Sequence, residues 1–300
     1  MVSATQPFTG PALNRRTLNS ASRTAELVAV VRAGHFRHQG GRLYADPVAE
    51  KLLSPVWKLV AGNRFLFWFM QHIAMAKVSH VQTQILLRAR VVSEQVMRAV
   101  QSGTRQYMIL GAGYDSFALT HAPEGQGLQV FEVDHPQTQA SKRQRLAASG
   151  LLVPESLRFV AVDFETQNLS EMLLAQGWNP EKKSIVSWMG TTYYLSQQAI
   201  EENLRQLHEL LPCGSLLVLD HGLNNGSLDV WTIQEYEDLR NFVSKRGEPM
   251  ISQFSPQVFR RMASNCGFVV RRTWTPQQQH SMCKGLPFSG FSQFVLLERV

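Results

Sequence analysis

From residue 105 onward, short β-rich runs alternate with helical runs. The candidate strands are Tyr107–Leu110, Leu128–Val133, Leu157–Val162, Ile185–Trp188, Leu216–Leu219, Phe268–Trp274 and Gln293–Glu298. The clearest helix between them is Ser196–Leu211, which Ser196 caps and Pro212 ends. Consecutive strands joined through helices need crossover connections. The alternation therefore predicts an α/β fold with a doubly wound, mostly parallel sheet and helices on both of its faces.

The last two candidate strands are joined differently. The segment between them, about residues 275–292, shows no helical periodicity. We therefore expect a terminal hairpin, with one antiparallel strand at an edge of the sheet.

The first 104 residues have mainly helical patterns. Ser22 is expected to cap one helix, Asp46-Pro47 to begin another, and residues 81–100 to form a longer one. The most apolar stretch, residues 56–76, is expected to form one or two helices with five large side chains facing inward: Phe65, Phe67, Trp68, Phe69 and Met70. We predict a tail and helical lid over 1–104, a core over 105–300, and a lid insertion at about 222–260.

Composition and charge narrow the class of protein. The chain has 300 residues, a net charge of +7 and three widely spaced cysteines. The basic residues form no block of the kind seen in nucleic-acid modules, the cysteines form no metal or disulfide pattern, and charged residues interrupt the apolar stretch. The first twenty residues lack an apolar signal segment. We expect a cytoplasmic protein with no metal, nucleic-acid or membrane partner.

A glycine-rich turn follows the first candidate strand. The run Leu110-Gly111-Ala112-Gly113 leads from that strand into a helical pattern. Glycines allow the backbone to approach a ligand closely, and the start of a helix offers N–H donors. A dinucleotide-binding fingerprint would have a third glycine where this chain has Ser116, so a pyrophosphate site loses support.

The second and third candidate strands both end in an acid. Asp134 follows Gly113 by 21 residues and can accept hydrogen bonds from both hydroxyls of a ribose. Asp163 can accept from an adenine amino group, while the Phe164 amide can donate to the ring. Strand-end acids are also ordinary solvated or turn residues. Glycine, acid and acid at three successive strand ends nevertheless predict a site for adenosine without a phosphate chain.

Several longer motifs are typical of one family. They are Ser22-Arg-Thr-Ala25, Tyr44-Ala-Asp46-Pro47, Arg88-Ala-Arg-Val-Val-Ser93, Glu132-Val-Asp-His-Pro-Gln-Thr-Gln139, Trp188-Met-Gly-Thr-Thr-Tyr-Tyr-Leu195 and Gly214-Ser-Leu-Leu-Val-Leu-Asp220. Through them nearly the whole chain resembles the leucine carboxyl methyltransferase family, in particular its bacterial small-molecule branch. The resemblance implies a seven-stranded class I (Rossmann-like) methyltransferase core with an N-terminal helical lid, and S-adenosylmethionine as cofactor.

The resemblance also implies roles for single residues. Arg88 would hold the carboxylate of the cofactor's methionine part, and Gly111 would lie against that part. Asp134 would bind the ribose, while Asp163 and Phe164 would bind the adenine. The flanking Ala112, Gly113, His135 and Met189 are assigned to the same cofactor site. Protein-modifying family members have a glutamate at the position of Met189, so the substitution argues for a small acceptor rather than a phosphatase tail.

The acceptor is expected to be a small acidic or hydroxylated molecule that is methylated on oxygen. A carboxylate needs no general base, whereas a hydroxyl does, and His221 is the candidate. A hydrogen-bonded structural role for His221 remains the alternative. Tyr193, Tyr194, His35, Arg37 and Arg64 are candidates for contacts with the acceptor. Two rival functions stay open, namely a nicotinamide-dependent oxidoreductase and a non-catalytic protein that binds S-adenosylmethionine.

Overall fold

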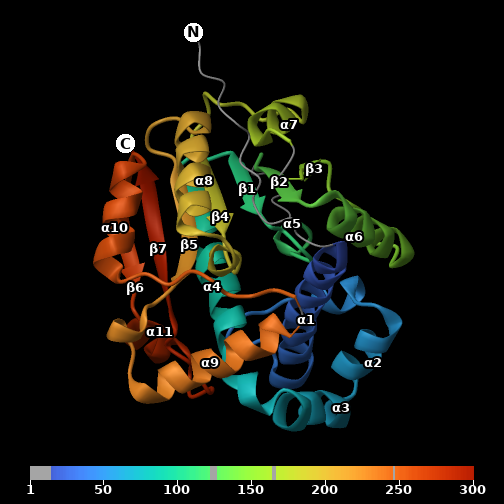
Figure 1. Cartoon of the computed structure of the whole chain (residues 1–300). Coiled ribbons are helices and arrows are strands. Elements are labelled where there is room, and N and C mark those ends of the chain that lie inside the picture. Colours follow the sequence, from blue (N-terminus) through green and yellow to red (C-terminus); the bar gives the residue numbers. More distant parts are fainter. Residues whose placement is uncertain (1–14, 122–126, 164–166, 246) are drawn as a thin grey trace.

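A single seven-stranded sheet organises the chain (Figure 1). The computed structural model describes residues 15–121, 127–163, 167–245 and 247–300. The strands are β1 Gln106–Leu110, β2 Gln129–Asp134, β3 Leu157–Ala161, β4 Ser184–Trp188, β5 Leu216–Gly222, β6 Phe268–Trp274 and β7 Ser292–Arg299. They lie in the order β3-β2-β1-β4-β5-β7-β6. All seven expected strands are confirmed, and the order reverses between β1 and β4, where doubly wound proteins bind ligands.

The antiparallel strand is not at the edge, which corrects the expected position. β7 pairs antiparallel with both β5 and β6, so β6 is the edge strand. The connection between β6 and β7 also contains a helix, α11 Pro276–Met282, where none was expected. Its capping box explains this, because Thr275 accepts from the Gln278 amide and the Gln278 side chain accepts from the Thr275 amide.

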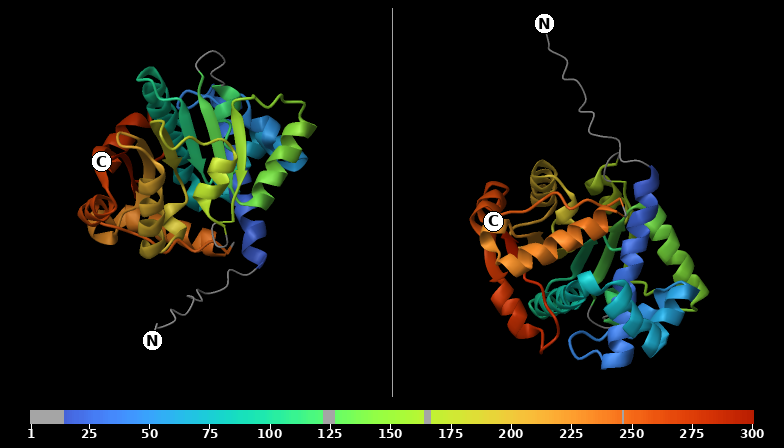
Figure 2. Two further views of the ribbon diagram at one scale, coloured as in Figure 1. Left: turned by 90° about the horizontal axis from the view of Figure 1, so that it is seen from above. Right: turned by 60° about the horizontal axis from the view of Figure 1, so that its bottom comes forward.

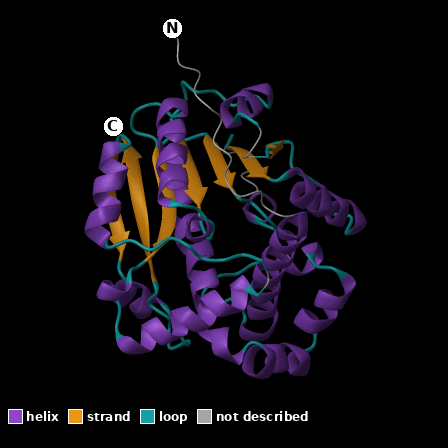
Figure 3. Cartoon of the chain, in the orientation of Figure 1, coloured by secondary structure: helices purple, strands orange, loops and turns teal. Residues whose placement is uncertain are grey.

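Two helical layers bury the sheet (Figure 3). On one face lie α7 Leu169–Ala175, α8 Gln197–Leu210 and α10 Pro256–Asn265, which pack on strand residues such as Phe131 and Leu219. On the other lie α4 Ser79–Gln101, the short α5 Phe117–Thr120 and α11. Ser196 caps α8 as predicted, by accepting from the Ala199 amide at 3.2 Å. α4, which belongs to the first 104 residues, packs directly on this face of the sheet.

The remaining helices cover the carboxyl ends of the strands, and we refer to them by position as the lid (Figures 1 and 2). They are α1 Arg15–Gln39, α2 Pro55–Gly62, α3 Arg64–Phe69 and α9 Val230–Ser244, with short turns at Ala49–Leu52, Met70–Ala74, Ala76–Val78, Thr192–Tyr194 and Asn225–Ser227. α6 Pro136–Ala148 packs beside α1. α1 begins at Arg15, earlier in the chain than the predicted start at Ser22. Asp46 instead precedes the short turn Ala49–Leu52 and accepts from the Ala49 amide at 2.9 Å.

Candidate active site

The glycine turn after β1 is held against two neighbouring strands. The Gly111 and Ala112 amides both donate to the Val133 carbonyl of β2, at 2.9 and 3.1 Å. Gly111 is exposed and has a φ of +67°, which disfavours any residue with a side chain. A Cβ there would lie 2.7 Å from the Thr191 methyl group, in the loop after β4. The turn is therefore tightly packed on one side and open on the other.

Asp134 faces the same turn from the end of β2. Its carboxylate accepts hydrogen bonds from the Gly113 amide and, at 2.6 Å, from the His135 amide. Burial raises the pKa of Asp134, although these two amides act in the opposite direction. His135 lies at the start of α6, where its Nδ1 accepts from the Gln137 amide. A carboxylate fixed beside a bare backbone turn can accept further hydrogen bonds from ribose hydroxyls.

The chain that leaves β3 runs alongside the end of β2. The Val162 amide donates to the Asp134 carbonyl at 3.0 Å, which places the two strand ends next to each other. The Asp163 amide donates to the Gln167 side chain at 2.9 Å. Phe164 lies outside the described residues, so its assigned contact with adenine stays a prediction.

Arg88 lies on the other side of the turn and is oriented by two partners. Its Nε is 2.5 Å from Oδ2 of Asp220 in β5, and its Nη2 donates to the Tyr193 hydroxyl at 3.0 Å. Tyr193 in turn donates to Asp220 at 2.7 Å. Burial alone would lower the pKa of Arg88, but the Asp220 carboxylate outweighs it and the pKa lies above its ordinary value. Arg88 therefore keeps its charge in a mostly buried position.

The loop after β4 brings Arg88 and the glycine turn together. The Gly190 amide donates to Oδ1 of Asp220 at 2.7 Å. A Cβ on Gly190 would lie 3.2 Å from Nη1 of Arg88, and the next residue, Thr191, touches Gly111. Met189 is partly buried against the α4 layer of the core. A continuous row of contacts thus joins the ends of β3, β2, β1 and β4 to Arg88.

Asp220 is a site residue to which the sequence analysis gave no role. It entered only as the last residue of the motif at residues 214–220, yet it is fully buried and holds Arg88, Gly190 and Tyr193. The signal was present, because Asp220 lies at the carboxyl end of a candidate strand, like Asp134 and Asp163. The order of strands in the sheet, which places β5 beside β4, was needed to use it.

His221 points to the opposite face of the sheet from Asp220, as alternate residues of a strand do. Its ring stacks on Phe259 of α10, with 4.1 Å between centroids, and its Nδ1 lies 3.1 Å from the Gly222 carbonyl. Burial lowers the pKa of His221 to about 4. These surroundings are those of a structural histidine, so the general-base role stays a prediction that the geometry does not favour.

The other predicted acceptor contacts are dispersed. Tyr194 is next to Tyr193, with 6.4 Å between ring centroids, and burial raises its pKa above the ordinary value. His35 is buried between Gln39 and the Leu43 amide. Arg37 forms an ion pair with Glu50, and the Arg37 side chain is 51% exposed. Arg64 is exposed at the start of α3. Of these predicted acceptor contacts, only Tyr193 and Tyr194 lie next to Arg88 and Asp220.

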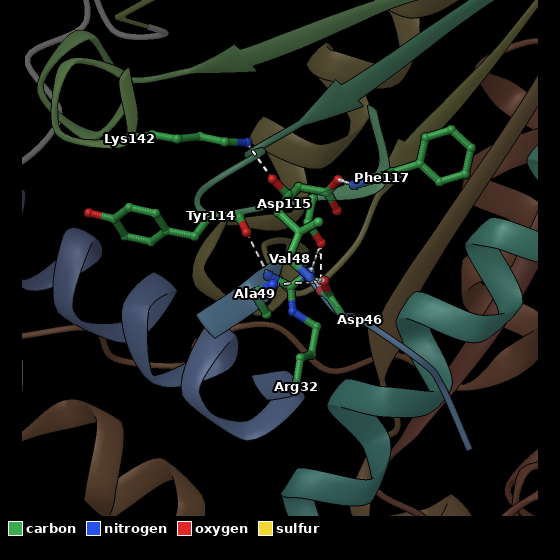
Figure 4. Close-up of polar contacts among 9 residues, drawn as sticks. Arg32, Asp46, Val48, Ala49, Tyr114, Asp115, Phe117 and Lys142 are labelled. Atoms are coloured by element: carbon green, nitrogen blue, oxygen red, sulfur yellow. Dashed lines mark hydrogen bonds and ion pairs between the residues drawn. The ribbon is translucent and has the colours of Figure 1, made fainter. Parts of the chain in front are cut away.

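The lid is fastened directly onto the glycine turn (Figure 4). Arg32 of α1 donates to the Tyr114 carbonyl at 2.6 Å and pairs with Asp46 at 3.3 Å. The Ser116 hydroxyl donates to the same Asp46 carboxylate at 2.5 Å. Ser116 stands where a dinucleotide fingerprint has glycine, and its buried hydroxyl is used for this contact.

Two further contacts lie over the turn. A Cβ on Gly113 would be 3.1 Å from the Cβ of Ala25 in α1. The Thr24 hydroxyl donates at 2.8 Å to Glu248, which follows α9. Both parts of the lid therefore meet above the glycine turn, an arrangement that can exclude water from a bound ligand.

A buried ion pair between β2 and α6 supports the glycine turn. Glu132 of β2 and Lys142 of α6 are each 1% exposed, with 2.5 Å between carboxylate and ammonium. Lys142 also donates to the Asp115 carbonyl at 2.5 Å (Figure 4). Burial raises the pKa of Glu132 to about 7, against the effect of Lys142.

Metal-ligand groups, disulfides and membrane-spanning helices are absent among the described residues. Among the residues that the structure describes, no three His, Cys, Asp or Glu side chains are grouped so as to hold a metal ion. Cys213, Cys266 and Cys283 are all free thiols. Within the described ranges, no helix has both the length and the apolar character needed to cross a bilayer.

Solved structures match the fold. A DUF574 family protein from Streptomyces avermitilis superimposes with a TM-score of 0.56 over 90% of this chain and 97% of that chain. The sequence identity is 15%, so the likeness concerns the fold alone.

Sequence relatives are named as methyltransferases. A Bacillus subtilis protein named "Putative S-adenosyl-L-methionine-dependent methyltransferase YktD" is 28% identical over 273 residues, covering 86% of this chain and 90% of its own. A Saccharopolyspora erythraea protein with the same kind of name is 31% identical over 204 residues, covering 66% of each chain. The family model described as leucine carboxyl methyltransferase matches residues 25–208, which is more than half of the chain. The chain therefore belongs to the leucine carboxyl methyltransferase family.

Proposed function

We propose that the protein transfers the methyl group of S-adenosylmethionine to a carboxylate or hydroxyl oxygen of a small acceptor. The observation that carries the proposal is the row of contacts from Asp134 through the glycine turn to Arg88. It places a carboxylate, an open stretch of backbone and a fixed cation side by side at the switch point of the sheet. The family and the named relatives support the same cofactor.

The residues fit the two ends of the cofactor. Asp134 would accept from the ribose hydroxyls, with Gly111, Ala112, Gly113 and His135 supplying backbone around it. Asp163, on the neighbouring strand end, would face the adenine. At the other end, Arg88 would bind the cofactor's carboxylate beside Met189. Arg88 is suited to this because Asp220 and Tyr193 hold its Nε and Nη2, which orients the guanidinium before any ligand arrives.

The chain's own part in the reaction is positioning. When bound, the cofactor would supply a sulfonium methyl group for the acceptor oxygen, with S-adenosylhomocysteine as the leaving group. The lid contacts of Arg32, Thr24 and Ala25 hold α1 over the turn, where it would exclude water from the bound ligand. Tyr194, whose raised pKa keeps it neutral, would offer its hydroxyl to the acceptor. The Tyr193 hydroxyl proton is already donated to Asp220.

An ionised acceptor oxygen requires no base, and the geometry supports that form of the reaction. The candidate base, His221, faces α10, away from Asp220 and Arg88. A carboxylate acceptor is ionised at neutral pH and attacks without losing a proton. We therefore propose a carboxyl acceptor first and a hydroxyl acceptor second.

Isothermal titration with S-adenosylmethionine and S-adenosylhomocysteine tests the cofactor site. Asp134→Ala should weaken the binding of both ligands by about tenfold or more, because the substitution removes hydrogen bonds to an ionised group. Glu155→Gln, at an exposed position before β3, is the matched control and should bind like the wild type. Folded wild-type protein that binds neither ligand, or that binds NADH instead, would refute the proposal.

The methyl acceptor is found by a separate assay. The wild-type protein is incubated with S-adenosylmethionine and panels of small acids and alcohols, and S-adenosylhomocysteine release is measured. Release with acids supports the carboxyl form, and release with alcohols only supports the hydroxyl form. Cofactor binding without release on either panel would favour a non-catalytic protein.

A further inference from the structure

The outer side of the lid exposes a group of large apolar side chains. In α2, α3 and the following turn, the exposed members are Val56, Leu59, Phe65, Trp68, Phe69 and Ile73. We call this set the apolar lid surface. Phe65 is 68% exposed and Trp68 47%. The sequence predicted that Phe65, Trp68 and Phe69 face inward, and that is wrong, since only Phe67 and Met70 of the five expected side chains are buried.

Packing of α3 on α1 determines which side chains are left outside. Phe67 lies against Gly34, where even a Cβ would come within 2.1 Å of its ring. That close fit sets the rotation of α3 and turns the other aromatic residues outward. Trp68 stacks with His72 at 5.2 Å and with Phe65 at 6.3 Å between centroids. The exposed rings are thus an ordered cluster supported by a buried anchor.

The charges around this surface are mainly positive. The carboxylate of Glu50, which lies beside Gly62 of α2, is paired with Arg37. Lys51, Lys58, Arg64 and Lys77 lie in and around it, and no Asp or Glu occurs from residue 51 to residue 93. None of the four cations forms an ion pair with a carboxylate in the described parts of the chain. α2 and α3 are at the periphery of the lid, away from the sheet (Figures 1 and 2). The surface is therefore apolar, aromatic and basic at the same time.

These properties select one kind of partner. A group of exposed apolar side chains bordered by charged residues is typical of an interaction site. A symmetric dimer through this face would bring the four cations of one copy against those of the other. An anionic bilayer surface instead accepts aromatic and aliphatic side chains at headgroup depth and attracts the lysines and arginine. We propose that the apolar lid surface docks the protein on an anionic bilayer surface without crossing it.

This inference is independent of the proposed methyl transfer and replaces the expectation that the protein has no membrane partner. The test is co-sedimentation of the full chain with vesicles of phosphatidylcholine alone or mixed with phosphatidylglycerol. Wild-type protein should bind the anionic vesicles and lose binding as salt is raised. The F65S/W68S/F69S variant should not bind. Lys58→Glu with Arg64→Glu should bind about tenfold more weakly or worse, because each cation near an anionic surface contributes separately.

Two controls make the result specific. Trp231→Ser removes another exposed tryptophan, 83% exposed on α9, and should bind like the wild type. Trp68→Phe should abolish the blue shift of tryptophan emission on vesicle binding while retaining most of the binding. Equal binding by F65S/W68S/F69S, or absence of wild-type binding to anionic vesicles, would overturn the proposal. A dimer in sedimentation velocity that this triple variant abolishes, without vesicle binding, would assign the surface to a second copy.

Discussion

The guanidinium of Arg88 in α4 and the carboxylate of Asp220 in β5 form a mostly buried ion pair, with 2.5 Å between Nε and Oδ2. The side chain of Asp220 is completely buried and that of Arg88 is 16% exposed. Asp220 also accepts from the Gly190 amide and the Tyr193 hydroxyl. One carboxylate therefore orients the predicted cofactor-binding arginine, the loop after β4 and a tyrosine of the predicted acceptor site.

Replacing Asp220 with Ala should damage both stability and cofactor binding. The variant leaves a buried guanidinium without its partner, which costs about 3 kcal/mol of unfolding free energy. Chemical denaturation measures this loss, and titration with S-adenosylmethionine measures affinity. Glu94→Ala, which breaks the more exposed Arg90–Glu94 pair, should change stability by less than about 1 kcal/mol. An Asp220→Ala protein with wild-type affinity would show that Arg88 needs no orienting partner.

Gly111→Ala should be far more harmful than Gly103→Ala, although both glycines have positive φ. Strain at φ alone costs about 1 kcal/mol, which is all that Gly103→Ala should lose because nothing lies within 4 Å of its Cβ. At Gly111 the new methyl group would meet Thr191 at 2.7 Å and displace the loop that carries Gly190. Thermal unfolding and cofactor titration of both variants measure the difference.

A second substitution separates strain from collision at Gly111. Thr191→Ser removes the methyl group that the new Cβ would touch and keeps the hydroxyl. The Gly111→Ala/Thr191→Ser protein should recover part of the lost affinity for S-adenosylmethionine. No recovery would mean that backbone strain, rather than contact with the loop after β4, causes the loss.

Glu132 should make stability depend on pH. Its pKa is about 7 in the folded protein and 4.5 ordinarily, so between these values the unfolded chain has released a proton that the folded chain keeps. The contribution of Glu132 is then complete below pH 4.5 and is lost as pH rises through 7. Relative to Glu132→Gln, the wild type should lose about 1–3 kcal/mol from pH 4.5 to pH 7.5. Urea unfolding at a series of pH values tests this, with Glu155→Gln as the exposed control. Parallel curves for wild type and Glu132→Gln would mean that Lys142 keeps the carboxylate ionised throughout.

His221→Gln should keep methyl transfer within several-fold of the wild type, because the ring is stacked on Phe259 and faces away from Arg88. Loss of a general base would instead reduce kcat by about 10²–10⁴-fold.

The stability of the same His221→Gln variant should be less sensitive to acid than that of the wild type. His221 has a folded pKa of about 4, so from pH 6.5 down to pH 4 the unfolded chain takes up a proton that the folded chain does not, and wild-type stability falls. Turnover at pH 7 and unfolding at pH 7 and 4.5 give both answers, and a large loss of kcat without unfolding would restore His221 as the base.

Most of the sheet was predictable because local patterns carry it. Each of the seven strands is a short β-rich run between turn residues, and the buried face of α8 follows from Ile200, Leu204 and Leu207. The capping box of α11 is present in the sequence as Thr275-Pro-Gln-Gln278, but this segment lacks the apolar periodicity that identifies the other helices. The candidate cofactor residues Asp134 and Gly113 were likewise paired from spacing, and the structure joins them by a hydrogen bond.

What the sequence by itself determined is the set of strands, the glycine turn and the strand-end acids, because these depend on neighbours along the chain. Only the tertiary structure decided that Asp220 rather than His221 faces Arg88. It also decided that β7 lies between β5 and β6 in the sheet, and that Phe67 rather than Trp68 is buried in the lid. Each of these depends on which distant segment packs against a given face. Periodicity identifies an apolar face, but contacts such as Phe67 with Gly34 determine which residues occupy it.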